Sequence, residues 1–167
     1  MSNRDDFKPA NKKTAAYEMK RVEIPLPELN WFLHQAVGAD FLWGGRENWG
    51  REEWTTHVDR VELETWMMYV SGTPAGYFEI EYDDGSRIRS FGLLKQFFGQ
   101  GLGGVLLNKA VDRSWDIGAA RVWLTTCTHD HPNALKNYLA RGFKVIEEKI
   151  EPANSTTQSI LFKSSAK

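Results

Sequence analysis

The chain has 167 residues, a formal net charge of −1 and one cysteine, and this length suits a single domain with its own hydrophobic core. Because acidic and basic residues nearly cancel and no segment carries a block of like charge, we expect neither a nucleic-acid partner nor electrostatic binding to a membrane. No apolar run approaches the roughly 20 residues that cross a bilayer, and the first residues lack the apolar core of a signal peptide, so we expect a cytoplasmic protein.

The N-terminal part of the chain divides into a leader and the start of a domain. Residues 1–16 mix basic, acidic and small side chains, and this composition predicts a flexible leader before a domain that spans residues 17–167. The first strand is expected at 17–24. It ends before Pro25 and Pro27, because proline cannot donate a hydrogen bond to a strand ladder.

Two helices are expected next, separated by a loop rich in glycine and tryptophan. Apolar side chains at helical spacing predict a helix at 28–37, and a second helix is expected at 51–61. The chain between them contains four glycines and two of the seven tryptophans. Large aromatic side chains dominate protein cores, but they also suit the wall of a pocket.

Three strands joined by tight turns follow the helices. Strands are expected at 65–70, 75–82 and 86–94. The sequence Ser-Gly-Thr-Pro at 71–74 predicts the first turn, and Asp-Asp-Gly at 83–85 predicts the second, because Asp-Gly suits a positive φ. This pattern indicates antiparallel pairing.

The second half of the chain alternates helices and strands. A glycine-rich run at 99–104 opens an amphipathic helix that Gly118 ends. The remaining elements are expected to be a strand at 121–126, a helix at 132–141, and strands at 143–150 and 157–162. This order predicts an α+β fold, in which a mixed, largely antiparallel sheet has helices on both faces, rather than a doubly wound parallel sheet.

The glycine-rich run predicts an anion site, because the first N–H groups of a helix lack internal partners and glycines let a diphosphate come close. The glycines are Gly99, Gly101, Gly103 and Gly104. One alternative is close packing of the helix on the sheet. Another is a dinucleotide site, since three of these glycines match G-x-G-x-x-G. That site would need an acidic residue at the end of the next strand, where residues 125–127 are Thr-Thr-Cys.

Two segments resemble signatures of the GNAT family of N-acetyltransferases. Residues 91–107 resemble the family's motif A, a strand followed by a glycine-rich turn and a helix with paired leucines, and read FGLLKQFFGQGLGGVLL. Residues 134–143 resemble the family's A-x-x-x-Y-x-x-x-G-F and read ALKNYLARGF. The segment HDHPNAL at 129–135 is similar to one bacterial subgroup of the family.

The resemblance implies the acyl-CoA N-acyltransferase fold, acetyl-CoA as co-substrate and no metal. Three positions depart from the family pattern, because Phe98 replaces Gln or Arg, Lys95 replaces a common proline and His131 replaces an asparagine. Arg87 stands where some members carry a catalytic glutamate, so the resemblance supplies no general base. The residues that it implies for cofactor binding are Phe91, Gly92, Leu93, Lys95, Gly99, Gln100, Gly101, Leu102, Gly103, Gly104, His131 and Asn133.

Amide formation from a thioester needs a neutral amine, a stabilised carbonyl oxygen and an acid for the departing thiolate. The resemblance points to Tyr138 as this acid, because a phenol with a pKa of about 10 keeps its proton at neutral pH. The alternative is a tyrosine that packs its helix on the sheet. For the base we expect Glu79, acting through water, because strand alternation places it on one face with Tyr77 and Glu81. The alternative is an ordinary solvated strand face.

Trp43, Arg46 and Trp49 are the expected acceptor-binding residues, because the resemblance places the loop between the first two helices beside the acceptor site. Aromatic walls and an arginine would suit an apolar or aromatic acceptor that bears a carboxylate. The alternative is that the aromatic residues cover the edge of the core. His129 and His131 have a spacing found in metal sites, but no third ligand is evident, so we expect no metal.

These patterns together predict an N-acetyltransferase that moves the acetyl group of acetyl-CoA to a primary amine of a small molecule, by direct attack in a ternary complex. Two alternatives come from other classes. One is a non-catalytic acyl-CoA-binding sensor or interaction module, and the other is a nucleotide-dependent oxidoreductase. The sequence leaves a homodimer open, because dimers are common among proteins of this kind.

Overall fold

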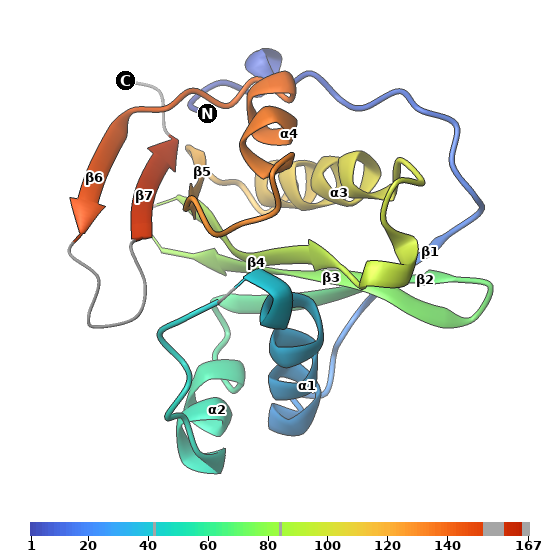
Figure 1. Cartoon of the computed structure of the whole chain (residues 1–167), viewed down its shortest axis with the longest axis vertical. Helices are drawn as coiled ribbons and strands as arrows, with labels where there is room; N and C mark the ends of the chain where they lie inside the picture. Colours follow the sequence, from blue (N-terminus) through green and yellow to red (C-terminus); the bar gives the residue numbers. More distant parts are fainter. Residues whose placement is uncertain (42, 84, 152–158, 165–167) are drawn as a thin grey trace.

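A computed structural model describes residues 1–41, 43–83, 85–151 and 159–164 (Figure 1). It contains one central sheet between two layers of helices. Within the described ranges, no helix is both long and apolar enough to cross a membrane.

The centre of the molecule is a seven-stranded sheet in the order β1-β2-β3-β4-β5-β7-β6. Strands β4 and β5 pair in parallel, and the other neighbours pair antiparallel. This confirms the predicted mixed and largely antiparallel sheet. The strands are β1 (Glu18–Arg21), β2 (Leu63–Val70), β3 (Thr73–Tyr82), β4 (Ser86–Leu93), β5 (Val122–Thr126), β6 (Glu147–Glu151) and β7 (Ser159–Ser164).

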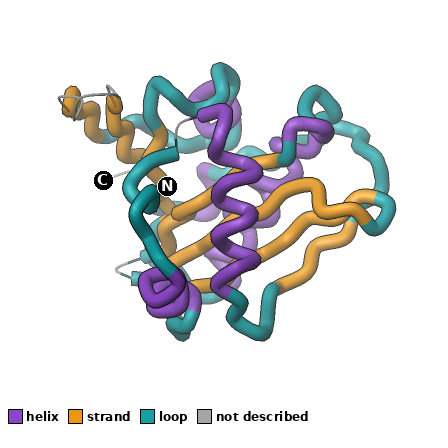
Figure 2. Tube along the Cα trace, turned by 60° about the horizontal axis from the view of Figure 1, so that its bottom comes forward, coloured by secondary structure: helices purple, strands orange, loops and turns teal. Residues whose placement is uncertain are grey.

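Helices cover both faces of the sheet, as the sequence predicts. Helices α1 (Pro27–Gly38) and α2 (Arg51–Val58) lie on one face, and α3 (Leu102–Asp116) and α4 (Ala134–Ala140) lie on the other. Figure 2 turns the first pair toward the viewer, with the strands behind. Helix α2 ends earlier than the expected residue 61, because Asp59 leaves the helical region at φ −89° and ψ 56°.

The central strand β3 is buried on both sides. Phe78 and Ile80 face the larger core cluster with α3, whereas Tyr77 faces a smaller cluster with α1. Alternating side chains therefore point to opposite faces, as the strand period requires. Because helices cover both faces, Glu79 is buried as completely as its apolar neighbours.

Strands β4 and β5 part before they end. Their parallel pairing runs only as far as Ile88 and Leu124. A bulge lies in the β3–β4 pairing at the same level, between Glu79 and Ile80. In the part of the chain that the structure describes, the edge of β4 beyond Ile88 therefore has no neighbouring strand. The resulting opening between two strand ends positions the site described below.

Residues 1–16, for which we expect a flexible leader, include a segment that lies against α3 and α4 in the structure. Met1 is buried in the larger core cluster, and its amino group donates to the carbonyl of Val122 at 2.7 Å. Further along, the backbone N–H of Lys8 donates to the carbonyl of Arg141 at 3.1 Å. The N–H of Ala10 donates to Oδ1 of Asn108 at 2.8 Å. Apolar burial and backbone pairing hold the segment in place, and composition alone does not reveal either.

Replacement of Gly142 tests this docking. Gly142 and Gly118 both have a positive φ, at 91° and 85°, so alanine at either position should cost roughly 1–2 kcal/mol from the left-handed backbone. At Gly142 the added Cβ would also meet the carbonyl of Asp6, whereas at Gly118 it would meet nothing. We therefore expect Gly142→Ala to lower the free energy of unfolding by a further ~1–3 kcal/mol in urea titrations. Equal losses in the two variants would contradict the docked segment.

Candidate active site

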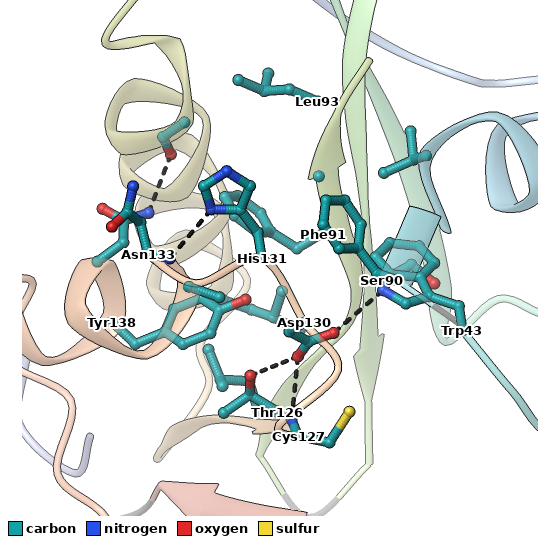
Figure 3. Close-up of a pocket in the computed structure, with 18 of the residues that line it drawn as sticks. Trp43, Ser90, Phe91, Leu93, Thr126, Cys127, Asp130, His131, Asn133 and Tyr138 are labelled. Atoms are coloured by element: carbon teal, nitrogen blue, oxygen red, sulfur yellow. Dashed lines mark hydrogen bonds between the residues drawn. The ribbon is translucent and has the colours of Figure 1, made fainter. Parts of the chain in front are cut away.

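A cavity of about 1070 Å³ lies at the opening between β4 and β5. It is bounded by the loop that follows α1, by the start of α3 and by α4. Most of the predicted site residues converge here although they come from distant parts of the chain (Figure 3). Those that line it are Trp43, Arg46, Trp49, Phe91, Gly92, Leu93, Gly99, Gly101, Gly103, Gly104, His131, Asn133 and Tyr138.

Four predicted residues do not line the cavity with their side chains. Lys95 is exposed and pairs with Asp40 at 2.9 Å. Gln100 donates to the carbonyl of Gln96 at 3.0 Å. Leu102 lies in the larger core cluster, so only its backbone is left for a ligand. The fourth, Glu79, is fully buried within the fold.

The glycine-rich end of the cavity has the features of an anion site. Helix α3 begins after Gly101, whose φ is 78°, and no side chain caps its first N–H groups. A Cβ built at Gly103 would approach only Leu93, at 3.7 Å. Lys12, Lys136 and Arg141 line the same region and add positive charge. Exposed helical N–H groups and nearby cations together favour a phosphate or diphosphate.

Tyr138 projects from α4 into the cavity with its hydroxyl directed toward Asp130 (Figure 3). Its ring makes edge contacts with Phe91 and Phe143, at centroid distances of 6.0 and 6.2 Å. Burial, with a further contribution from the negative charge of Asp130, raises the pKa of Tyr138 well above its usual value. The phenol therefore keeps its proton at neutral pH, and packing alone does not account for a hydroxyl that faces a cavity.

Asp130 is a cavity residue to which the sequence assigns no role of its own. Trp43 donates its indole N–H to Oδ1 of Asp130 at 3.2 Å (Figure 3). The backbone N–H of Cys127 donates to Oδ2 at 3.1 Å, and the hydroxyl of Thr126 donates to the same oxygen. The carboxylate thus joins the loop after α1 to the segment after β5. The sequence feature that could have identified Asp130 is its position, as an acidic residue four places after the end of β5.

Glu79 is held in a buried network rather than in the cavity. Its Oε1 accepts from Asn30 at 2.7 Å. Its Oε2 accepts from Ser90 at 2.8 Å and lies 3.2 Å from both Arg46 and His57. Arg60 approaches Nδ1 of His57 at 3.3 Å, which places the His57 proton on Nε2, toward the carboxylate.

The surroundings of Glu79 do not fit the expected base acting through water. Burial by itself would raise the pKa of Glu79, but the hydrogen bond from His57 and the charge of Arg46 outweigh it and hold the pKa well below its usual range. A carboxylate that is fully covered, already engaged by four partners and hard to protonate is a weak proton acceptor. Its geometry suits the positioning of Arg46 instead.

Two tryptophan rings flank Arg46, one of the residues predicted for acceptor binding. The guanidinium lies 5.0 Å from the ring of Trp49 and 5.2 Å from that of Trp54. Its Nη2 contacts Glu79, and its Nη1 is covered and has no hydrogen-bond partner. His34 lines the cavity nearby, and burial, followed by the charge of Arg46, lowers its pKa to about 4. This histidine is therefore neutral at pH 7.

No group of three metal-ligating side chains converges within the described residues. His131 instead accepts at Nδ1 from the backbone N–H of Asn133 at 3.1 Å. Its ring packs edge-on against Phe98, with centroids 5.2 Å apart. These contacts place His131 at the wall of the cavity beside the start of α4.

Three solved acetyltransferases have the same fold as this chain. The ribosomal-protein-S18-alanine N-acetyltransferase from Escherichia coli has a TM-score of 0.70 and 14% identity over 89% of this chain and 92% of that one. PaiA N-acetyltransferase from Thermoplasma acidophilum, in complex with coenzyme A, has a TM-score of 0.65 and 14% identity over 90% and 99%. An acetyltransferase from Bacillus anthracis, in complex with acetyl coenzyme A, has a TM-score of 0.56 and 14% identity over 64% and 63%.

At these identities the likeness establishes the fold. A sequence search among curated proteins found no significant match. The model of the acetyltransferase (GNAT) family, however, matches residues 29–143, which include both signature segments and every residue given above as lining the cavity except Lys12. The chain therefore belongs to the GNAT family of acetyltransferases.

Proposed function

We propose that the protein transfers the acetyl group of acetyl-CoA to a primary amine of a small molecule, by direct attack while both substrates are bound. Family membership makes the chain an acetyl-CoA-dependent N-acetyltransferase. One observation carries the finer proposal: the uncapped start of α3 and the hydroxyl of Tyr138 open into the same cavity, where β4 and β5 part.

The donor half of the cavity fits a diphosphate-containing substrate. The N–H groups at the start of α3 would hold the pyrophosphate, with Lys12 and Arg141 as neighbouring cations. The unpaired edge of β4 around Phe91 and Leu93 offers backbone groups to the amide-containing arm. Lys95 and Phe98 differ from the family pattern. Backbone contacts of this kind tolerate such differences, because the contacts do not depend on side-chain identity.

The proposed reaction requires two proton transfers. Transfer forms a C–N bond and breaks the thioester C–S bond, so the amine loses a proton and the departing sulfur gains one. Tyr138 is protonated and reaches the cavity, so it is the residue that we assign to the sulfur. The same burial that raises its pKa would raise that of a neighbouring thiolate, which keeps the transfer feasible.

The amine is proposed to enter without a dedicated base. Arg46, Arg87 and Arg89 line the acceptor half of the cavity. Positive charges at close range disfavour an ammonium group and therefore favour the neutral amine. Glu79 does not act as the base in this scheme; it neutralises Arg46.

The size of the cavity supports a small acceptor. Its volume of about 1070 Å³ must accommodate the arm of the donor as well as the acceptor, and ordinary small-molecule sites occupy roughly 300–1,000 Å³. Trp43 and Trp49 close the acceptor side. The half-buried, free thiol of Cys127 fits the reducing cytoplasm that we propose as the location.

Calorimetric titration with acetyl-CoA, followed by a thiol-release assay with a panel of amines, tests this function directly. We expect binding of acetyl-CoA and turnover of at least one small primary amine. Binding without turnover of any acceptor would favour a non-catalytic sensor. A melting temperature that shifts with NAD but not with acetyl-CoA would favour the oxidoreductase alternative.

Replacement of Gly103 by valine tests the donor site. Because a Cβ there meets only Leu93 at an ordinary contact distance, and valine suits a helix slightly better than glycine, the melting temperature should stay the same or rise. The side chain would nevertheless shield the N–H groups at the start of α3. We expect the dissociation constant of acetyl-CoA to increase at least about tenfold, ~1.4 kcal/mol, in calorimetry. Unchanged affinity for acetyl-CoA in the folded variant would rule out phosphate binding by the N-terminal end of α3.

Tyr138→Phe tests the acid. The ring and its contacts with Phe91 and Phe143 remain, but the proton is lost, so kcat should fall by roughly 10²–10⁴ in the thiol-release assay. Acetyl-CoA affinity should change little. Tyr69→Phe is the matched control, because its hydroxyl contacts Met67 on β2, outside the cavity lining. Full activity of Tyr138→Phe would reduce this tyrosine to a packing residue.

The Glu79→Gln variant distinguishes a positioning role of Glu79 from a role as the general base. Loss of one partner of a buried ion pair costs about 3–5 kcal/mol, so we expect a drop of that size in the free energy of unfolding. Glu18→Gln, at an exposed pair with Lys20, should change it by less than about 1 kcal/mol. The acidic limb of the pH–rate profile should keep its midpoint in Glu79→Gln. Disappearance of that limb, with stability unchanged, would restore Glu79 as the base.

A further inference from the structure

The acceptor half of the cavity holds more positive charge than the surrounding carboxylates neutralise. Arg87 and Arg89 lie on β4 and line the cavity together with Arg46. Arg46 is paired with Glu79 at 3.2 Å. Arg89 contacts Glu81 at 2.7 Å, but that carboxylate also binds another arginine, Arg60, at 2.5 Å. Three of the four arginines in this region therefore share two buried glutamates, and Arg87 pairs with neither.

Arg87 is the arginine left without an acidic partner. Its Nη2 approaches only the hydroxyl of Thr125, at 3.4 Å, and its Nε is covered and has no hydrogen-bond partner. Among the residues that the structure describes, no carboxylate lies within ion-pair distance of it. Glu47 and Asp130, the two acidic residues that line the cavity, make no ion pair with Arg87.

The ring of Trp123 lies against one side of Arg87 and its Nε is covered, so the two terminal Nη groups are the donors left for a ligand. The guanidinium carbon lies 4.8 Å from the centre of the Trp123 ring. Stacking of this kind holds the guanidinium plane while its N–H groups point outward in the plane. A carboxylate is the group that such an edge binds best, because its two oxygens match the fork of N–H donors.

The charge around Arg87 favours an incoming anion. Burial, followed by the positive charge of Arg89, lowers the pKa of Arg87 from its ordinary value, although Glu81 opposes this shift. Arginine nevertheless stays protonated in proteins. Each like charge beside a half-buried cation destabilises it, and one bound negative charge would offset that repulsion.

We propose that Arg87 is the receptor for a carboxylate on the acceptor, so that the substrate class is a primary amine that also bears a carboxylate, as an amino acid does. This inference rests on the proposed acetyl transfer. It moves the expected carboxylate contact away from Arg46, because Glu79 neutralises Arg46 and its Nη1 is covered. Polyamines, which bring only positive charge, are poor acceptors for this site.

Binding of reaction products tests the inference without relying on turnover. The probes are N-acetylglycine, N-acetylleucine and N-acetylphenylalanine, each paired with its carboxamide, titrated by calorimetry into protein saturated with coenzyme A. The carboxamides keep size and shape but lack the charge. We expect at least one acid to bind at least about tenfold more tightly than its amide, and we expect Arg87→Gln to abolish this preference.

Matched variants make the result specific to Arg87. Arg87→Lys keeps the charge but not the planar fork, so it should retain part of the preference. Arg51→Gln removes an exposed arginine that pairs with Glu28 and should leave the preference intact. Equal affinity for acids and amides, binding of neither, or a preference that survives Arg87→Gln would overturn the inference.

The thiol-release assay keeps this inference distinct from the proposed function. Leucine and phenylalanine are compared as acceptors with 3-methylbutylamine and 2-phenylethylamine, which are the same molecules without the carboxylate. Preferred turnover of the amino acids supports the inference. Turnover that favours the plain amines would overturn the carboxylate receptor while the acetyltransferase function stands. Absence of turnover with every acceptor would overturn the function, and the product titrations would still decide whether Arg87 binds carboxylates.

Discussion

The part of the cavity that we propose for the acceptor depends on one buried carboxylate. Glu79 lies on the central strand with none of its surface exposed. An ionised carboxylate in such a place is unstable unless donors replace its water. Asn30 of α1, His57 of α2 and Ser90 of β4 supply those contacts, together with Arg46 of the intervening loop. The need to satisfy one charge therefore fixes the relative positions of two helices, a loop and a strand.

That requirement also sets the chemistry of the cavity. Because Glu79 neutralises Arg46, the arginine serves as a support between Trp49 and Trp54 rather than as a free charge. A second carboxylate, Glu81, is shared by two further arginines. Arg87 is the arginine without a carboxylate partner among the described residues, and it stands at the position where some family members carry a catalytic glutamate. An unneutralised cation in the cavity is the feature on which our proposals of a neutral bound amine and an anionic acceptor both rest.

The two halves of the cavity are built on different principles. The donor half uses backbone: the glycine-rich turn, the uncapped N–H groups of α3 and the free edge of β4. Such a site tolerates changes of side chain, as Phe98 and Lys95 illustrate. The half that we propose for the acceptor uses side chains from α1, β4 and the loop that follows α1. Its specificity is therefore particular to this chain, and it can differ among proteins that share the fold.

The sequence by itself determined what depends on local residues. Hydrophobic period and turn residues predicted the strands, helices and mixed sheet. The glycines at 99–104 were identified by their spacing, and Tyr138 by its match to the family signature. These features are readable because a turn, a helix end or a strand period involves neighbours in the chain. The surroundings of Glu79, Arg87 and Asp130 were decided only by the tertiary structure. A charged side chain acts as a base, a support or a receptor according to the charges that distant elements bring within a few ångströms and to the water that they exclude. Neither quantity is encoded in local spacing, because Glu79 and its partner Asn30 are 49 positions apart.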